Sequence, residues 1–232
     1  MITVFTSSYN YSRYLRRAIE SVLNQTYRDF EYHLIDYGST DDTWKIINEY
    51  KDERIKAIQL DYKPRNAYAV NYSMRLALGD YWAWCPADDY WTTDLLERKI
   101  DYAQRYPKAV LYDDFYLIND NNQEVGLSTL EDLTPEKIKE EIWKRSLIGF
   151  TGIFIPSYVY KELGLYFPYH VISDDFYWMI RATIFNVPFV RVPERLHYKR
   201  THAASMVNRN YDEVIKGMSL IWEELKYEKN IS

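Results

Sequence analysis

Asp88 and Asp89 are the residues whose type and spacing point most directly to chemistry in this sequence. They follow an apolar run, residues 81–85, that has the composition of a short strand. Two adjacent carboxylates at a strand end can share a hard cation, because Mg²⁺ and Mn²⁺ are held by one or two carboxylates together with phosphate oxygens of a substrate. A solvated acidic turn is the alternative interpretation, and the dipeptide alone leaves both open.

The first hundred residues alternate strand-like and helix-like patterns that are joined by short polar turns. This alternation predicts an α/β fold with a mostly parallel central sheet and helices on both of its faces. A helix capped by Thr40 or Asp41 is expected to run to Tyr50, and Gly79 is expected to close the next helix. The other elements expected here are strands at residues 2–6, 30–35, 55–60 and 81–85 and helices at residues 12–25 and 66–78.

Polar turns follow the first, second and fourth of these strands, at residues 7–10, 36–41 and 86–89. In sheets of this kind, ligands bind outside the carboxyl ends of the strands. All three turns fall on that edge, so segments that lie tens of residues apart in the sequence are expected to converge in space. We therefore place the candidate site at this edge of the sheet.

The pattern loosens after about Pro107. An antiparallel hairpin is expected there, and no internal repeat divides the chain. We expect one domain over residues 1–232, with a regular half at residues 1–106, a more variable half at residues 107–210 and a C-terminal helix within residues 211–232. The remaining elements expected are strands at residues 109–118, 123–127, 152–155 and 187–192 and helices at residues 135–145, 174–185 and 211–228.

The composition is that of a globular chain that can bury a core, because 47% of its 232 residues are hydrophobic and 27% are charged. Lys and Arg number 29 against 34 Asp and Glu, so the formal charge is −5 and the chain lacks the overall basic balance of a nucleic-acid-binding protein. The single cysteine, Cys85, cannot form an intrachain disulfide. We therefore expect a reducing compartment and no nucleic-acid partner.

The sequence also predicts a protein without a membrane span. The longest uncharged apolar stretch, residues 146–160, is shorter than the roughly 20 residues that a bilayer requires. The N-terminus lacks the features of a signal peptide. We expect a cytoplasmic protein, and the 24 tyrosines and 7 tryptophans leave peripheral contact with the inner face of a membrane open. The oligomeric state is not predicted.

Several stretches resemble the opening of family 2 glycosyltransferases with the GT-A fold. Residues 18–27, Ala-Ile-Glu-Ser-Val-Leu-Asn-Gln-Thr-Tyr, carry the resemblance most specifically, because a chance match of ten residues is negligible. Similar matches occur at residues 8–10, 29–31, 35–43, 79–82 and 87–89. The resemblance is dense over residues 1–106 and can be traced to about residue 205, and it is nearest to the SpsA-like members of the family.

The resemblance implies an inverting glycosyltransferase. Such an enzyme moves a sugar from a nucleotide-diphosphate donor, UDP- or dTDP-linked, to a hydroxyl of a carbohydrate or lipid-linked acceptor in surface polysaccharide or glycoconjugate synthesis. It implies a Rossmann-like nucleotide-sugar half at residues 1–106 and an acceptor half at residues 107–210. It also implies Mn²⁺ or Mg²⁺ as a cofactor, since a cation neutralises the charge that builds on the departing nucleoside diphosphate.

Each matching position carries an implied role in the donor site. The Tyr9 ring would lie against the base, Asp88 would face the ribose or the metal, and Asp89 would ligate the metal. The residues implied to hold the nucleotide are Ser7, Tyr9, Asp36, Arg65 and Asp88.

The second half resembles the family at two further places. Asp174 and Asp175 match an acidic pair at the start of a helix, which implies Asp175 as the general base and Asp174 as a positioning or acceptor-binding residue. The alternative is that the pair only caps a helix N-terminus. His202 matches a histidine that reaches the metal or the diphosphate, although a histidine in a loop can equally be structural. Its neighbours Lys199 and Arg200 are expected to fold over a diphosphate.

Three positions depart from the family pattern. Ser7 stands where a proline is common, Tyr37 stands where a second aspartate would face the base, and Pro86 replaces the leading aspartate of the longer metal motif. These departures keep a second hypothesis open, a degenerate non-catalytic module that binds a nucleotide or a glycan. A nucleotidyltransferase is disfavoured, because the sequence lacks a glycine-rich loop between a strand and a helix.

Overall fold

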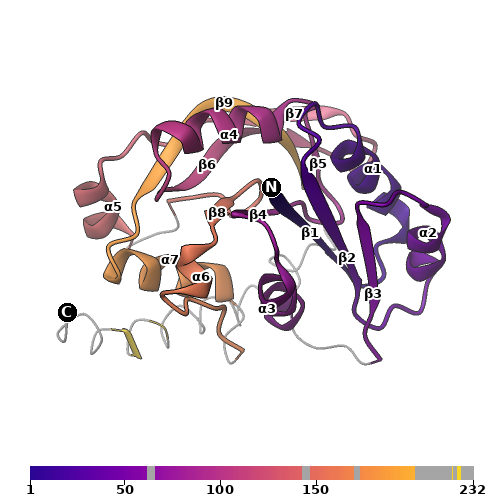
Figure 1. Ribbon diagram of the computed structural model, residues 1–232. Coiled ribbons are helices and arrows are strands. Elements are labelled where there is room, and N and C mark those ends of the chain that lie inside the picture. Colours follow the sequence, from indigo (N-terminus) through magenta and orange to yellow (C-terminus); the bar gives the residue numbers. More distant parts are fainter. Residues whose placement is uncertain (62–65, 143–146, 170–172, 202–220, 222–223, 226–232) are drawn as a thin grey trace.

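The computed structural model describes residues 1–61, 66–142, 147–169 and 173–201, together with Ile221, Glu224 and Leu225. A curled central sheet is flanked by helices, with the first half of the chain at one end of the sheet and the second half at the other (Figure 1). The strands are β1 (Ile2–Ser8), β2 (Phe30–Asp36), β3 (Ile55–Gln59), β4 (Tyr81–Trp84), β5 (Tyr90–Trp91), β6 (Val110–Ile118), β7 (Glu124–Ser128), β8 (Phe154–Pro156) and β9 (Phe189–Arg200). The helices are α1 (Ser12–Leu23), α2 (Thr43–Glu49), α3 (Asn66–Leu76), α4 (Leu95–Arg105), α5 (Pro135–Glu141), α6 (Tyr158–Lys161) and α7 (Asp174–Ile184).

The strands form one sheet in the order β3-β2-β1-β4-β8-β6-β9-β5, with β7 paired to β6. The first four strands in this order are parallel, whereas β8 runs antiparallel to β4 and β6, and β5 runs antiparallel to β9. The expected α/β class with a helix-flanked sheet is confirmed. The pairs within the first half of the chain are all parallel, whereas the second half is mixed: β6 pairs with β9 in parallel, and β6 and β7 are joined by a short hairpin, which requires antiparallel pairing.

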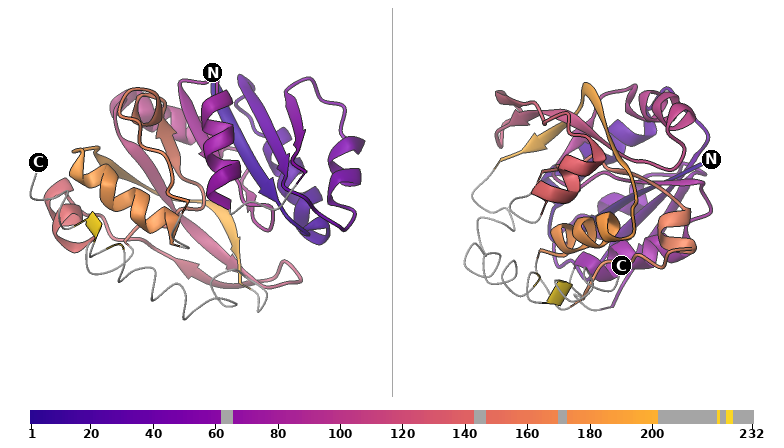
Figure 2. Two further views of the ribbon diagram at one scale, coloured as in Figure 1. Left: turned by 90° about the horizontal axis from the view of Figure 1, so that it is seen from below. Right: turned by 90° about the vertical axis from the view of Figure 1, so that its left-hand side faces the viewer.

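The sheet separates two hydrophobic cores, because successive side chains of a strand point to opposite faces. Phe5, Ile35 and Trp82 pack with α3, α5, α6 and α7 on one face. Val4 and Leu34 pack with α1, α2 and α4 on the other. The views in Figure 2 show these helices on both sides of the sheet.

The parallel register brings the carboxyl ends of the first strands to one edge. Ser8 pairs with Asp36, and Asp36 pairs with Gln59, so β1, β2 and β3 end at the same level. Trp84, the last residue of β4, pairs with Phe5 of β1, the Cys85 N–H donates to the Phe5 carbonyl, and the turn with Asp88 and Asp89 follows. We call this edge, with the turns that follow β1, β2 and β4, the rim.

Asp41 anchors the helices that follow β1 and β2. Its Oδ2 accepts a hydrogen bond from the backbone N–H of Ser12, and its Oδ1 accepts one from the N–H of Thr43, both at 3.0 Å. Burial alone would raise the pKa of Asp41, but these bonds outweigh it and lower the pKa. One carboxylate therefore binds the first turns of both α1 and α2, where unpaired N–H groups favour negative charge.

Gly79 has a different role from the expected one. Helix α3 ends at Leu76, and Gly79 does not adopt the left-handed conformation of a helix-closing glycine. A Cβ at this position would lie 2.5 Å from the backbone nitrogen of Thr3. Glycine is therefore required because the chain entering β4 passes directly against β1.

Other boundaries differ where tertiary pairing decides them. Strand β9, expected at residues 187–192, extends to Arg200, because it pairs with β6 along its length. Of the expected C-terminal helix, the described residues Ile221 and Leu225 are buried with α7, and the rest lies outside the described residues.

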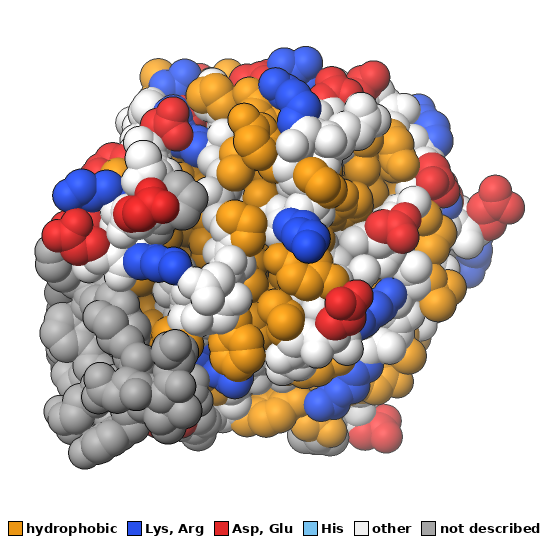
Figure 3. Space-filling model, turned by 60° about the vertical axis from the view of Figure 1, so that its left-hand side comes forward, with side chains coloured by type: hydrophobic (Ala, Val, Ile, Leu, Met, Phe, Trp, Pro, Cys, Tyr) orange, Lys and Arg blue, Asp and Glu red, His pale blue; other side chains and the backbone are white. Residues whose placement is uncertain are grey.

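Among the described helices, none is long and apolar enough to cross a bilayer. On the face shown in Figure 3, apolar side chains lie across the middle, with acidic and basic side chains interspersed.

Candidate active site

Two aromatic rings stand side by side where β1 and β2 end. The rings of Tyr9 and Tyr37 stack with centroids 5.6 Å apart and planes inclined by 26°. Next to them, the Ser7 hydroxyl donates to Asn66 Oδ1 at 2.8 Å, which ties the end of β1 to the start of α3. Tyr37, which departs from the family pattern, thus extends the aromatic surface that the resemblance assigns to the base.

Three carboxylates from distant parts of the sequence act electrostatically on the Tyr37 hydroxyl. Burial raises the pKa of Tyr37, and the neighbouring Tyr11 and the charges of Asp88, Asp174 and Asp36 raise it further. Asp36 ends β2, Asp88 follows β4, and Asp174 begins α7. The rim therefore brings these three predicted site residues within electrostatic reach of one group, and it joins the two halves of the chain.

Asp36 is fully buried, and both of its carboxylate oxygens are bonded to the protein. Oδ1 accepts from the backbone N–H of Ser39 at 3.0 Å, and Oδ2 accepts from the Gln59 amide at 3.2 Å. The turn from Asp36 to Ser39 contains Gly38, whose φ of 91° suits glycine. Asp36 thus braces the turn that carries Tyr37.

Asp89 is buried to 4% exposure beside the half-buried Asp88. Its Oδ1 accepts a hydrogen bond from the backbone N–H of Arg200 at 2.7 Å. Burial and the adjacent Asp88 charge raise the pKa of Asp89, and the Arg200 N–H and the charges of Lys199 and Arg200 oppose this only in part. Asp89 is therefore a buried carboxylate whose charge the surrounding protein does not fully balance.

Arg200 holds the Asp88–Asp89 turn, a role that the sequence analysis missed. Its Nε donates to the Asp88 carbonyl at 2.9 Å, and its two terminal nitrogens donate to the Asn119 carbonyl and to Asn122 Oδ1. The guanidinium also lies 4.5 Å from the centre of the Tyr14 ring. Arg200 is only 5% exposed, so its hydrogen bonds are used within the protein, contrary to the expectation that it covers a diphosphate.

Asp174 and Asp175 form the first turn of α7, as expected. Asp174 Oδ1 accepts from the Asp175 N–H at 2.9 Å, and Asp175 Oδ1 accepts from the Phe176 N–H at 2.8 Å. The pair therefore accepts hydrogen bonds from N–H groups in the first turn of α7, as residues near a helix N-terminus do, and its role in catalysis stays a prediction. Burial also raises the pKa of Asp175, and the Phe176 N–H and the Lys199 charge oppose the rise.

Lys199 links the two carboxylates with raised pKa values. Its charge acts on both Asp89 and Asp175, and its ammonium lies 5.4 Å from the centre of the Phe115 ring. The Asp88–Asp89 turn and the start of α7 therefore both lie within electrostatic reach of one lysine. That Lys199 folds over a diphosphate stays a prediction.

The rim has donors that suit a hard divalent cation. Asp88 and Asp89 supply carboxylate oxygens, and Mg²⁺ sites that use substrate phosphates need only one or two. The incompletely balanced charge at Asp89 is the kind that a cation would neutralise. Within the described part of the chain, no group of three or more His, Cys, Asp or Glu side chains could hold a metal unaided. His202, predicted to reach the metal or the diphosphate, and Arg65, predicted to hold the nucleotide, lie outside the described residues.

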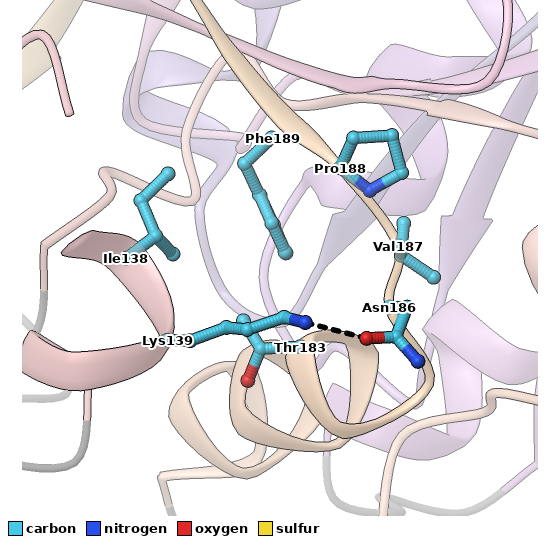
Figure 4. Close-up of a pocket in the computed structure, with 7 residues that line it drawn as sticks. All are labelled: Ile138, Lys139, Thr183, Asn186, Val187, Pro188 and Phe189. Carbon is cyan, nitrogen blue, oxygen red and sulfur yellow. Dashed lines mark hydrogen bonds between the residues drawn. The ribbon is translucent and has the colours of Figure 1, made fainter. Parts of the chain in front are cut away.

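A small pocket occurs elsewhere, between α5, the end of α7 and the start of β9 (Figure 4). Lys139 donates to Asn186 across it. None of the predicted site residues lines this pocket, so we place the candidate site at the rim. The lining residues are Ile138, Lys139, Thr183, Asn186, Val187, Pro188 and Phe189.

Known proteins resemble this chain over most of its length. The family model described as Glycosyl transferase family 2 matches residues 3–164. WfaP of Escherichia coli, a UDP-Glc:α-D-GlcNAc-diphosphoundecaprenol β-1,3-glucosyltransferase, is 27% identical over 95% of this chain and 85% of its own length. TuaG of Bacillus subtilis, a putative teichuronic acid biosynthesis glycosyltransferase, is 32% identical over 67% of this chain and 62% of its own length.

Solved structures share the fold. TarS 1–349 of S. aureus in complex with UDP-GlcNAc superposes with a TM-score of 0.79 at 19% identity, over 95% of this chain and 65% of that one. The mannosyltransferase PcManGT of Pyrobaculum calidifontis, in complex with GDP-Man and Mn²⁺, gives a TM-score of 0.67 at 15% identity, over 90% of this chain and 59% of that one. The match to the family model covers more than half of the chain, and the arrangement of the sheet agrees with that of the solved structures. The chain therefore belongs to glycosyl transferase family 2 and has the GT-A fold.

Proposed function

We propose that this protein is an inverting glycosyltransferase that transfers a sugar from a nucleotide-diphosphate donor to a hydroxyl acceptor. The observation that carries the proposal is that the turn after β4 and the start of α7 lie within electrostatic reach of the same groups: Asp88 and Asp174 both act on Tyr37, and Lys199 acts on both Asp89 and Asp175. A site with hard oxygen ligands on one side and a basic carboxylate on the other suits metal-assisted displacement of a diphosphate.

The donor is assigned to the end formed by β1, β2 and the Asp88–Asp89 turn. The Tyr9 ring would lie against the base, and Asp88 and Asp89 would hold the cation. Mn²⁺ or Mg²⁺ bound there would neutralise charge on the departing diphosphate. Ser7 and Asp36 act indirectly, because Ser7 fixes the start of α3 and Asp36 braces the turn that carries Tyr37.

The general base is assigned to Asp175. A general base works best when its pKa is near the pH of the reaction. An ordinary aspartate has a lower pKa, and burial raises the pKa of Asp175 towards that range. Asp175 takes the proton from the acceptor hydroxyl as the oxygen attacks the anomeric carbon, and Asp174 next to it positions the acceptor. A single displacement of this kind inverts the anomeric configuration.

The names of the relatives support a proposal for the substrate class. We assign a UDP-linked sugar as the donor and a lipid-linked saccharide as the acceptor, because WfaP is named for both. Activity on such an acceptor would place the protein at the inner face of a membrane, in the synthesis of a surface polysaccharide.

The test compares the parent with Asp175→Asn, which keeps the size and the hydrogen bond of the side chain. Transfer from UDP-glucose, UDP-galactose and UDP-N-acetylglucosamine is measured with Mn²⁺ present, and donor binding is measured by calorimetry. We expect kcat to fall by about 10²–10⁴-fold while donor affinity stays within a few-fold. Equal turnover by the variant and the parent would remove Asp175 from the mechanism.

A non-catalytic nucleotide-binding module is the second candidate, and the Tyr9–Tyr37 stack favours it. The stacked pair gives an aromatic surface for a base without the carboxylate that the family pattern has at position 37. Such a module would bind UDP in calorimetry but would neither hydrolyse nor transfer any donor of the panel. Turnover of a single donor rejects it.

A further inference from the structure

A chain of buried polar groups, outside the residues assigned above, ends at the hydroxyl of Thr151. Lys99 Nζ lies 2.6 Å from Asp113 Oδ1, and neither side chain has any exposed surface. Asp113 Oδ2 lies 2.7 Å from His197 Nδ1, and His197 Nε2 lies 2.9 Å from Thr151 Oγ1. These residues come from α4, β6, β9 and the segment before β8, so four separate segments meet here.

The charged residues Lys99 and Asp113 decide which atoms of this hydrogen-bonded series donate and which accept. The Lys99 ammonium can only donate, and the Asp113 carboxylate can only accept, so His197 Nδ1 carries the hydrogen that it donates to Asp113. One ammonium and one carboxylate already balance, and a neutral imidazole leaves this fully buried group without net charge. His197 Nε2 is then an acceptor, and Thr151 donates its hydroxyl hydrogen to it. Thr151 Oγ1 can therefore only accept hydrogen bonds from other partners.

The packing around His197 fixes its orientation. The Phe115 ring stacks on the imidazole with centroids 5.1 Å apart. On another side, a Cβ at Gly152 would lie 2.7 Å from His197 Nδ1 and 2.8 Å from Asp113 Oδ1. Gly152 also has a φ of 76°, so the backbone next to Thr151 is shaped to lie against the imidazole and the carboxylate. The Thr151 hydroxyl is thus held by rigid neighbours.

Thr151 belongs to the surroundings of the rim. The N–H of the next residue, Gly152, donates to the carbonyl of Trp84, the last residue of β4, at 3.4 Å. His197 lies two residues before Lys199 on β9, so the two side chains share a face, and both contact Phe115. Thr151 is half-buried, so part of it is exposed. Its neighbour Gly152 contacts the end of β4, and its hydrogen-bond partner His197 shares a face of β9 with the lysine that acts on Asp175.

We propose that Thr151 Oγ1 accepts a hydrogen bond from a hydroxyl group of a sugar bound at the rim, and that His197, Asp113 and Lys99 are positioning residues that fix its polarity. The inference rests on the proposed function, because it requires a sugar at this place. The transferred sugar of the donor and the sugar of the acceptor present the same chemistry, so the test separates these two sources.

The main variant is Thr151→Val, which removes the hydroxyl and keeps the shape, with Thr151→Ser as the conservative variant that restores it. Calorimetry with Mn²⁺ compares UDP with the sugar nucleotide of the panel that the parent binds most tightly, and initial rates give KM for the donor and for the acceptor. We expect Thr151→Val to lose about tenfold in kcat/KM and Thr151→Ser to recover most of it.

The two sugar sources give different results. If the donor sugar is the partner, Thr151→Val binds the sugar nucleotide about tenfold more weakly and binds UDP as the parent does. If the acceptor sugar is the partner, donor binding is unchanged and only the acceptor KM rises. His197→Gln is expected to weaken sugar-nucleotide binding in the first case and to raise the acceptor KM in the second. If His197 had only a structural role, its substitution would not confine the change to one of the two sugars.

Thr183→Val is the matched control. Thr183 is 4% exposed, and its hydroxyl donates to the Ile180 carbonyl at 2.7 Å within α7, beside the pocket of Figure 4 and away from the rim. Its loss should leave both KM values unchanged. If Thr151→Val does not fold, Thr151→Ala replaces it, because a half-buried site tolerates the smaller side chain.

Two negative results have separate meanings. A folded Thr151→Val or Thr151→Ala variant that matches the parent in donor binding and in both KM values overturns this inference alone. A parent protein that binds neither UDP nor any sugar nucleotide overturns the proposed function, and the inference falls with it.

Discussion

Asp113 and Asp89 are buried almost equally, at 1% and 4% exposure. Their pKa values nevertheless shift in opposite directions. Burial alone would raise the pKa of Asp113, but Lys99 and His197 outweigh it and lower the pKa. Burial raises the pKa of Asp89, the adjacent Asp88 raises it further, and the nearby N–H and cations do not compensate. The core carboxylate has its cation built in, whereas the rim carboxylate lacks a full partner.

This difference indicates where the protein is organised for stability and where it is organised for a ligand. A buried charge is tolerated when a partner of opposite charge and hydrogen bonds surround it. At Asp113 the fold supplies all of these from α4 and β9. At Asp89 the described residues supply one backbone N–H and the charges of Lys199 and Arg200, which do not fully offset the burial, and a bound cation would supply the remaining compensation in the donor site that we propose.

The largest expected effect is on stability, from Asp113→Asn. The substitution leaves the Lys99 ammonium without a carboxylate in a place that water does not reach. We expect the free energy of unfolding to fall by about 3–5 kcal/mol, measured by urea unfolding with tryptophan fluorescence. The double variant Lys99→Met with Asp113→Asn removes both charges and should recover most of the loss. If the single variant loses less than about 1 kcal/mol, Asp113 is not the partner that compensates the buried charge of Lys99.

Asp89→Asn tests the other side of the comparison. The amide oxygen can still accept from the Arg200 N–H, and the uncompensated charge is removed. We expect transfer to fall on the order of 10²–10³-fold, while the melting temperature without metal stays the same or rises. Enzyme assays and thermal melts on one preparation measure both. A variant that unfolds more easily but keeps its activity would show that Asp89, like Asp113, serves the fold.

The sequence predicted the elements of the first half and the convergence of its turns. Asp36 and Asp88 were expected at one edge, and both act electrostatically on Tyr37, because strand order and register follow from hydrophobic patterning, whereas only the family resemblance pointed to Asp174. Their roles in catalysis stay predictions. The buried network was missed, since 84 residues separate Asp113 from His197 and no local pattern links them.

A signal for Lys99 was nevertheless present. It lies on the stripe of α4 that contains Leu95, Leu96 and Ala103, at the helical spacing of buried positions. A lysine on such a stripe indicates a buried charge that must find a carboxylate. The Arg200 contacts had no comparable signal, because they depend on where the hairpin between β6 and β7 places Asn119 and Asn122.

The smallest expected effect concerns Glu31, a second carboxylate with a built-in cation, at the opposite edge of the sheet. Burial alone would raise its pKa, but hydrogen bonds from Lys56, Thr3 and the Leu78 N–H lower the pKa from 4.5 to about 2. A carboxyl whose pKa is lower in the folded state than in the unfolded state stabilises the fold above the unfolded value. That contribution is lost as the pH falls from about 4.5 to about 2.

We expect this loss to be about 2–3 kcal/mol, which is reduced from the full shift because the Lys56 side chain is 44% exposed and therefore screened by solvent. Urea unfolding of the parent and of Glu31→Gln between pH 2.5 and pH 6 measures it. Other carboxyls titrate in both proteins, so the difference between the two curves isolates Glu31. That difference should shrink on acidification. A difference that stays constant across this range would show that Lys56 does not compensate Glu31 as Lys99 compensates Asp113, and that built-in pairing is confined to the deep core.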